Sequence, residues 1–231
     1  MFSNFQRAMS TTLKSVAGTA MLFFLSSPAI AGIISTSGSL IEIAAPDSVL
    51  EGALESDSVS SIFAERQGVT LANDLDINID APGTFFGSTN PVATMLAGTR
   101  IDSYFLHIDP VGSPGFTTYS GSVTFDQDLL GLITFRTKLD DSDALLGLAS
   151  VAYPTGQNSI LRGVLDTTGR RDEITLSADR RTVNFDLQVS QGNVEQMRFL
   201  LASSNAAVPE PATFTLFLAM AGIVTRIRRR A

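Results

Sequence analysis

The chain has 231 residues, with 16 Lys and Arg against 23 Asp and Glu, one His, and neither Cys nor Trp. The absence of Cys excludes a disulfide scaffold, a zinc-thiolate site and a cysteine nucleophile. The length suffices for one domain with a substantial core once both ends of the chain are set aside.

Residues 1–31 have the pattern of a secretory signal peptide. Basic residues precede any acidic one, and residues 16–25 (VAGTAMLFFL) form an apolar run that is too short for a stable membrane anchor. Small side chains at Ala29 and Ala31 occupy the two positions that a signal peptidase reads. Cleavage is therefore predicted to leave Gly32 as the new N-terminus. The lack of Cys is compatible with export, because the protein then needs no oxidative folding.

The segment between the two ends is strongly acidic. Residues 32–207 contain 22 Asp and Glu against 10 Lys and Arg, a net charge of −12, whereas the whole chain carries −7. Nucleic acid and anionic lipid both attract positively charged proteins, so neither is expected as a partner of this segment.

Residues 32–201 are predicted to form one β domain. In residues 74–80, Leu75, Ile77 and Ile79 alternate with polar side chains, which is the period of a half-buried strand. Further strands are predicted at residues 100–109, 122–126, 132–138, 174–177, 183–189 and 195–201. Helical character is confined to residues 142–147 and to parts of 45–57. Short strands separated by Gly, Pro and Asp favour an all-β, antiparallel β-sandwich or jelly-roll ectodomain.

One predicted pair of strands has a clear inner face. Residues 174–177 and 183–189 flank the turn Ala178-Asp179-Arg180-Arg181, which predicts a hairpin. In its second strand the apolar side chains alternate with polar ones, so they are expected to share a buried face: Val183, Phe185, Leu187 and Val189.

His107 is the single histidine, which excludes a metal site built on a histidine pair. Period-two geometry places His107 and Asp109 on the same face of the strand at 100–109. A serine hydrolase would also need a nucleophile nearby, and the chain has no G-x-S-x-G turn. We interpret His107 as a structural or surface residue, with contact to a ligand as the alternative.

Acidic residues suggest two further chemistries. A glycosidase needs two carboxylates across a cleft, but the candidate acids are close neighbours in predicted turns: Asp126, Asp128, Asp140, Asp141 and Asp143. We therefore predict no catalytic residues and no enzyme, with a secreted hydrolase as the least favoured alternative.

Calcium is the second chemistry. Residues 74–80 contain four oxygen-bearing side chains, but an extended strand cannot gather them round one ion, and Ile79 stands where a calcium loop needs Gly. No metal or other cofactor is predicted there. A contribution from Asp126 and Asp128, together with another loop, stays open as a weak calcium candidate.

The last residues form a distinct unit. A spacer of small residues, 202–207 (ASSNAA), precedes Val208-Pro209-Glu210-Pro211. Residues 212–224 then carry no charge, and four basic residues follow, Arg226, Arg228, Arg229 and Arg230. A helix of that apolar length covers only about 20 Å of a hydrocarbon core of roughly 30 Å. Long arginine stems extend its reach and favour the cytoplasmic side, so a short transmembrane anchor is predicted. The alternative, a buried amphipathic helix, would need a polar face that the run lacks.

This order of parts resembles the PEP-CTERM sorting signal of exosortase substrates, over residues 208–231. The resemblance implies export by a Gram-negative bacterium through the inner membrane, a transient membrane anchor, processing by an exosortase, and release to the cell surface or the outside. Such proteins commonly accompany exopolysaccharide in a biofilm matrix. Residues 102–112, 121–133 and 176–185 are similar to a recurrent group of PEP-CTERM proteins without assigned activity, which implies one continuous domain and brings no catalytic residues.

The sequence thus leaves two main hypotheses. The first is a non-enzymatic, exported surface or matrix protein, with signal peptidase and exosortase as transient partners. The second is a carbohydrate-binding module, calcium-dependent or not, that acts on the exopolysaccharide. Sugar-binding sandwiches usually offer aromatic platforms, and this chain has only Tyr104, Tyr119 and Tyr153 and no Trp, which weakens the second hypothesis without removing it.

Overall fold

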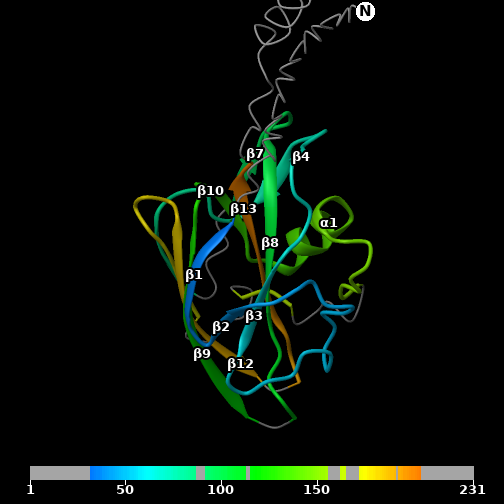
Figure 1. Ribbon diagram of the computed structural model, residues 1–231, viewed down its shortest axis with the longest axis vertical. Coiled ribbons are helices and arrows are strands. Elements are labelled where there is room, and N and C mark those ends of the chain that lie inside the picture. The colour runs from blue at the N-terminus through cyan, green and yellow to red at the C-terminus, as the bar shows by residue number, and fades with distance from the viewer. Residues whose placement is uncertain are drawn as a thin grey trace, which may run out of the picture.

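The structure, a computed structural model, describes residues 32–86, 92–112, 115–155, 162–164, 172–190 and 192–203. The predicted signal peptide with Ala29 and Ala31, and the predicted sorting segment 208–231, lie outside these residues. Within them the chain forms thirteen strands and one helix (Figure 1). The prediction of an all-β protein with antiparallel sheets is confirmed.

Five strands form the first sheet, which we call sheet A. All neighbouring strands in it are antiparallel. In spatial order they are β1 (Ile33–Gly38), β9 (Phe116–Phe125), β12 (Thr182–Ser190), β11 (Glu173–Leu176) and β6 (Gly83–Phe86). The long pair β9 and β12 occupies its centre, so residues far apart in sequence share this sheet.

Sheet B contains six strands and is antiparallel except for one parallel pair, β2 with β3. In spatial order the strands are β10 (Leu129–Ile133), β13 (Glu195–Ala202), β8 (Arg100–Ile108), β3 (Ser60–Ala64) and β2 (Leu40–Glu42), with β4 (Val69–Thr70) also paired to β8. Two short strands, β5 (Leu75–Ile77) and β7 (Ala93–Met95), pair separately, and the helix α1 spans Arg136–Leu146.

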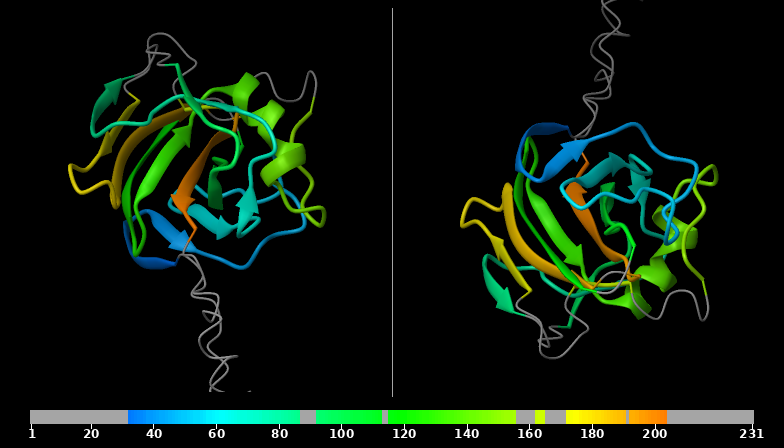
Figure 2. Two further views of the ribbon diagram at one scale, coloured as in Figure 1. Left: turned by 90° about the horizontal axis from the view of Figure 1, so that it is seen from above. Right: turned by 90° about the horizontal axis from the view of Figure 1, so that it is seen from below.

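Two apolar clusters hold these elements together. One lies between the sheets, where Val123 and Phe185 from sheet A meet Leu106 and Phe199 from sheet B. The other lies on the opposite face of sheet B, where Phe105, Leu200 and Ile77 pack with Leu139 of α1. Figure 2 shows the two sheets as adjacent layers and α1 at the side of sheet B away from sheet A. Sheet B is therefore buried on both faces, which is why β8 is buried from Ile101 to Ile108.

The predicted hairpin is confirmed. β11 pairs with β12 in antiparallel register, and the four alternate apolar side chains of β12 are buried. The strands predicted at 100–109 and 195–201 correspond to β8 and β13.

The strand predicted at residues 132–138 is wrong beyond Ile133. β10 ends at Ile133 and α1 begins at Arg136. The β-branched and aromatic residues before Arg136 suggested a continuous strand, but Leu139, Ser142 and Leu146 recur at helical spacing and are the buried residues of α1. The helix thus extends well before the predicted 142–147, whereas residues 45–57 contain no helix.

The alternation predicted for residues 74–80 stops at Asn78. Leu75, Ile77 and Ile79 are buried as expected, but Asn78, predicted on the polar face, is only 1 % exposed. Its Oδ1 accepts hydrogen bonds from the backbone N–H groups of Thr134 (2.9 Å) and Phe135 (3.1 Å). Asn78 therefore fixes the connection between β10 and α1, a long-range role that a local pattern does not reveal.

Candidate functional site

The outer face of sheet A carries a regular array of polar side chains. Burial alternates along β12, with odd-numbered residues inside and even-numbered residues outward, and β9 follows the same rule from Phe116 onward. The outward side chains of the two central strands are Thr118, Ser120, Ser122, Thr124, Thr182, Asn184, Asp186, Gln188 and Ser190, besides Phe116. We call this surface, with its extensions on β1, β11 and β6, the polar face.

One row crosses the whole polar face. The strand registers place five hydroxyl or amide side chains side by side, one from each strand: Ser37, Ser122, Asn184, Thr175 and Thr84. Adjacent strands lie about 4.8 Å apart, so the row is a regular line of hydrogen-bonding groups. Ser37 and Ser122 are joined at 2.8 Å, and Thr84 and Thr175 at 2.9 Å. These bonds orient the hydroxyls, and each oxygen retains lone pairs for an external donor.

The next row adds negative charge and an aromatic ring. Ser120, Asp186, Glu173 and Phe86 follow one another across the strands, and Ser120 donates to Asp186 at 3.0 Å. Phe86 is 56 % exposed and Phe116, farther along β9, is 63 % exposed. No Lys or Arg faces outward from the described strands of sheet A.

The three tyrosines do not supply an aromatic platform. Tyr104 and Tyr119 are buried between the sheets, and burial is the main cause that raises the pKa of each to about 12. Tyr153 is half-buried and donates to the Glu65 carboxylate at 2.7 Å, and burial beside that carboxylate raises its pKa. Any stacking surface on the polar face is therefore provided by phenylalanine.

His107 and Asp109 lie at the end of β8, each about 1 % exposed. His107 Nε2 is 3.9 Å from Asp109 Oδ2, as the shared strand face predicted. The Gln196 amide lies 3.0 Å from His107 Nδ1 and donates to the Val49 carbonyl at 2.8 Å. Burial, with a smaller contribution from Arg162, lowers the pKa of His107 to about 3, so the imidazole is neutral at ordinary pH. Burial raises the pKa of Asp109 to about 6.

A buried ionic cluster under α1 was not predicted. Arg198 of β13 donates two hydrogen bonds to the Glu65 carboxylate, at 2.7 and 2.8 Å, and one to Asp143 of α1 at 2.9 Å. Arg162 lies within 2.6 Å of Asp143 and 2.9 Å of Asp140. The side chains of both arginines have no solvent exposure. The cluster joins sheet B to α1, and its buried charges compensate one another, which is the arrangement of a structural ion-pair network.

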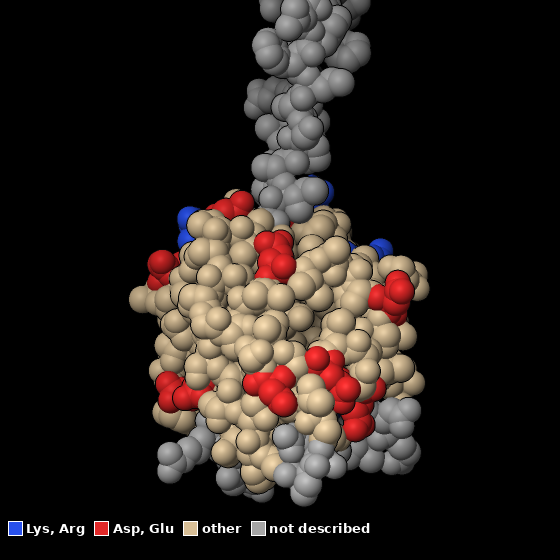
Figure 3. Space-filling model, turned by 60° about the horizontal axis from the view of Figure 1, so that its bottom comes forward, with Lys and Arg blue, Asp and Glu red and all other residues tan. Residues whose placement is uncertain are grey.

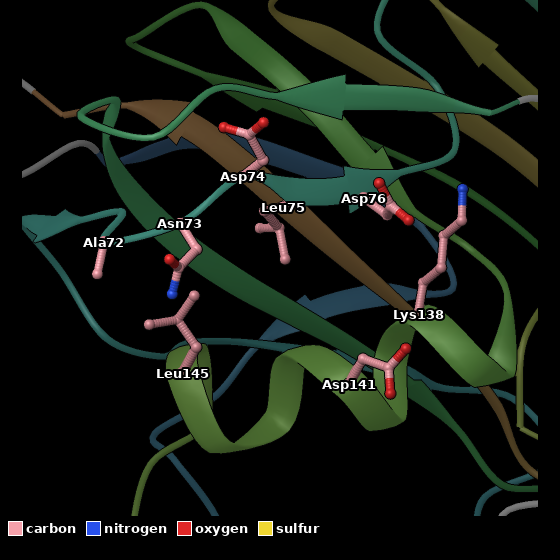
Figure 4. Close-up of a pocket in the computed structure, with 8 residues that line it drawn as sticks. All are labelled: Ala72, Asn73, Asp74, Leu75, Asp76, Lys138, Asp141 and Leu145. Atoms are coloured by element: carbon pink, nitrogen blue, oxygen red, sulfur yellow. The ribbon is translucent and has the colours of Figure 1, made fainter.

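An open hollow of about 370 Å³ separates α1 from β5. Figure 4 shows Lys138 and Asp141 rising from α1 and Asp76 facing them from β5. Lys138 donates to the Ile77 carbonyl, and Asp74 accepts from the Ala97 backbone N–H at 2.8 Å. Burial lowers the pKa of Lys138. These polar groups hold α1 and the β5–β7 pair in place.

The weak calcium candidates lie in the turn between β9 and β10. Asp126 Oδ1 accepts from the Gly32 backbone N–H at 2.7 Å, and Asp128 Oδ1 lies 3.0 Å from Arg181 Nε. The two carboxylates thus have separate partners. Among the residues that the structure describes, no group of three or more His, Asp and Glu side chains could hold a metal ion.

The surface agrees with the acidic composition. Figure 3 shows Asp and Glu side chains spread over one face of the molecule, and Lys and Arg only near its upper margin. Within the described ranges, no helix has the length and apolar character needed to cross a membrane.

In comparisons with known protein families, curated proteins and solved structures, nothing matches the chain.

Proposed function

We propose that the chain is an exported, non-enzymatic protein of the cell surface or extracellular matrix, sorted through its C-terminal segment by an exosortase and associated with exopolysaccharide. Two sequence motifs support the proposed export and sorting: a predicted signal peptide at residues 1–31 and a PEP-CTERM-like segment at residues 208–231. The short apolar span would hold the chain in the inner membrane until processing near residues 208–211.

The observation that carries this proposal is that the two ends of the described domain meet at one turn. Gly32 donates to Asp126, and the Ala202 backbone N–H donates to the Asp128 carbonyl at 2.9 Å. Every described strand lies between these two residues. Cleavage after Ala31 and again near Val208 would therefore remove both targeting segments and leave each sheet intact.

The burial of the histidine and of the strongest ion pairs supports a non-enzymatic role. His107 and Asp109 are enclosed at the end of β8, and the ion pairs of Arg198 and Glu65 are enclosed under α1. A catalytic acid or base must reach the substrate within hydrogen-bond distance, which these positions do not offer.

The test is the mass of the surface protein in the native host. Replacing Pro209, Glu210 and Pro211 together by Ala is expected to leave export intact but to yield a larger form held in the membrane. A matched triple change in the spacer, Ser203, Ser204 and Asn205 to Ala, is expected to leave processing unchanged. Equal masses for the Pro209–Pro211 variant and the wild type would reject sorting through this motif.

The polar face favours a second candidate function, the binding of a neutral polysaccharide. Sugars present hydroxyl groups, which pair with hydroxyl and amide side chains such as those of Ser122, Asn184 and Thr175. The carboxylates of Glu173 and Asp186 accept hydrogen bonds from sugar hydroxyls but repel anionic glycans. Phe86 and Phe116 offer apolar rings to the less polar faces of sugar rings.

This second function is tested by glycan-array binding of the exported, processed protein. Thr175→Val and Asn184→Ala are expected to reduce binding to neutral polysaccharide several-fold, because each removes a polar group from the central row. Thr94→Val makes the same change as Thr175→Val at an exposed position of β7, which pairs with β5 and is not part of sheet A, and is expected to bind as the wild type does. Binding that survives both changes in the polar face would reject this surface as the contact site.

A further inference from the structure

We propose that the amino group released at Gly32 by signal cleavage docks on the Asp126 carboxylate. Processing would thereby convert an amide hydrogen bond into an ion pair that ties the mature N-terminus to the fold. The inference rests on the proposed function, because it requires cleavage after Ala31. It assigns Asp126 a role that differs from calcium binding.

The position of the Gly32 nitrogen is set by residues that follow the cleavage site. The Gly32 carbonyl accepts a hydrogen bond from the Asp126 backbone N–H at 3.0 Å, and the Gly32 nitrogen donates to Asp126 Oδ1 at 2.7 Å. The next residue, Ile33, pairs with Phe125 in the ladder between β1 and β9, and its side chain packs against the core between the sheets. Because these contacts involve only residues from Gly32 onward, they survive removal of the signal peptide.

Cleavage changes the charge of this nitrogen but not its neighbours. A peptide N–H is a neutral donor, whereas a free α-amino group, with an ordinary pKa of about 7.7–8.0, is largely protonated at neutral pH. A hydrogen bond between an ammonium and a carboxylate is shorter and stronger than one between neutral groups. The half-buried position of Asp126 limits screening by water.

None of the neighbouring charged groups competes with the new N-terminus for the Asp126 carboxylate. Asp128, on the same turn, pairs with Arg181. Tyr104 of β8 faces the site, and burial together with the charges of Glu42, Asp102 and Asp126 raises its pKa to about 12, so its hydroxyl stays neutral. No Lys or Arg of the described residues forms an ion pair with Asp126.

The experiment measures the reactivity of the α-amino group in the exported, processed protein. The N-terminus is first established by sequencing, and the protein is then acylated near pH 7. Labelling of the N-terminal peptide is followed by mass spectrometry. In the folded wild type we expect the α-amino group to react several-fold more slowly than in Asp126→Asn, because the ion pair keeps it protonated and shielded. The same slowing is expected on comparing folded with urea-unfolded wild type, a measurement that needs no variant.

Asp128→Asn is the matched control, since it removes an equal charge from the same turn and is expected to react as the wild type does. Asn at residue 126 keeps an acceptor oxygen, and circular dichroism checks that the variant is folded. Equal rates in folded wild type and Asp126→Asn, or equal acceleration by Asp128→Asn, would overturn the docking while export stands. An exported protein that begins at another residue would overturn the proposed cleavage and, with it, this inference.

Discussion

The Arg198 guanidinium and the Glu65 carboxylate form a bidentate ion pair, at 2.7 and 2.8 Å, in which neither side chain is exposed to solvent. Arg198 also lies over the Phe105 ring, 5.0 Å from its centroid. The pair is 133 residues apart in sequence and fastens the last strand of sheet B to the end of β3.

The first prediction concerns the cost of breaking this pair. Arg198→Met is expected to lower the free energy of unfolding by about 3–5 kcal/mol, because it leaves the Glu65 carboxylate buried without its cation. Urea unfolding measures the change. Arg181→Met removes a surface pair whose side chains are 47 % and 54 % exposed, so its loss should be at most about 1 kcal/mol. Similar losses in the two variants would contradict a structural role for the buried pair.

The second prediction is a pH dependence with opposing contributions from His107 and Asp109. The pKa of Asp109 is raised to about 6 in the fold, so its contribution to stability is present at low pH and is lost as pH rises through 6. The pKa of His107 is lowered to about 3 from 6.5, so the unfolded chain takes up a proton below pH 6.5 and the fold loses stability as pH falls.

His107→Gln separates these contributions, because only that of Asp109 remains. Between pH 7 and pH 4.5 the free energy of unfolding of the variant should rise relative to that of wild type by roughly 2.5 kcal/mol, since each pH unit below the unfolded pKa of 6.5 costs the wild type about 1.4 kcal/mol. Urea unfolding at several pH values tests this. A difference between variant and wild type that stays constant with pH would show that His107 is not held neutral by burial.

The third prediction concerns the close contact between β1 and β9. Gly38 has a φ of 69°, and a Cβ there would lie 2.1 Å from the Ser120 carbonyl oxygen. Gly98, at a φ of 84°, has no atom within 4 Å of the corresponding position. Gly98→Ala should therefore cost only the backbone strain, about 1–2 kcal/mol, and Gly38→Ala about 1–3 kcal/mol more. Thermal unfolding compares them, and equal losses would contradict the tight contact.

The fourth prediction concerns the hairpin of β11 and β12. Phe185 is 4 % exposed and faces the cluster between the sheets, so Phe185→Asp should abolish folding by burying an unpaired carboxylate. Circular dichroism is expected to show loss of the β signal.

Asp179→Asn is the companion change, in the turn of the same hairpin. Asp179 Oδ1 accepts hydrogen bonds from Ser177 Oγ and from the Arg181 backbone N–H at 3.1 Å, and the Asn side-chain oxygen can accept both. The variant should melt within a few degrees of wild type. A severe loss here, or a folded Phe185→Asp, would reject this description of the hairpin.

Local periodicity in the sequence predicted those strands that have one face on the core and the other in solvent. β12 was predicted because Val183 and its alternates face a core while their neighbours face solvent. The same reasoning could not show that β8 is buried on both faces. Ser103 and His107 look polar in sequence, but both are buried, Ser103 bonded to the Glu65 carboxylate and His107 to Gln196. The start of α1 was missed because the helix is stabilised by tertiary packing of Leu139 more than by local propensity.

The candidate site was also only partly predictable. The Asp126–Asp128 turn was visible as a cluster of acids, but its contacts with Gly32 and Ala202 arise from strands that are distant in sequence. The row across the polar face depends on the register of five strands, and a one-residue shift would have turned each side chain to the other face. Register between distant strands has no local signature.

The position of β13 imposes an order of assembly. Among the strands that the structure describes, β13 is the last in sequence, yet it lies between β10 and β8 and pairs with both. A chain that crosses a membrane from its N-terminus emerges with sheet A's strands complete while β10 and β8 still lack their common neighbour. Until Arg198 arrives, Glu65 and Asp143 also lack that cation. If the chain is exported as proposed, β8 can pair with β3 and β4 early, but sheet B can be completed only after β13 has crossed the membrane.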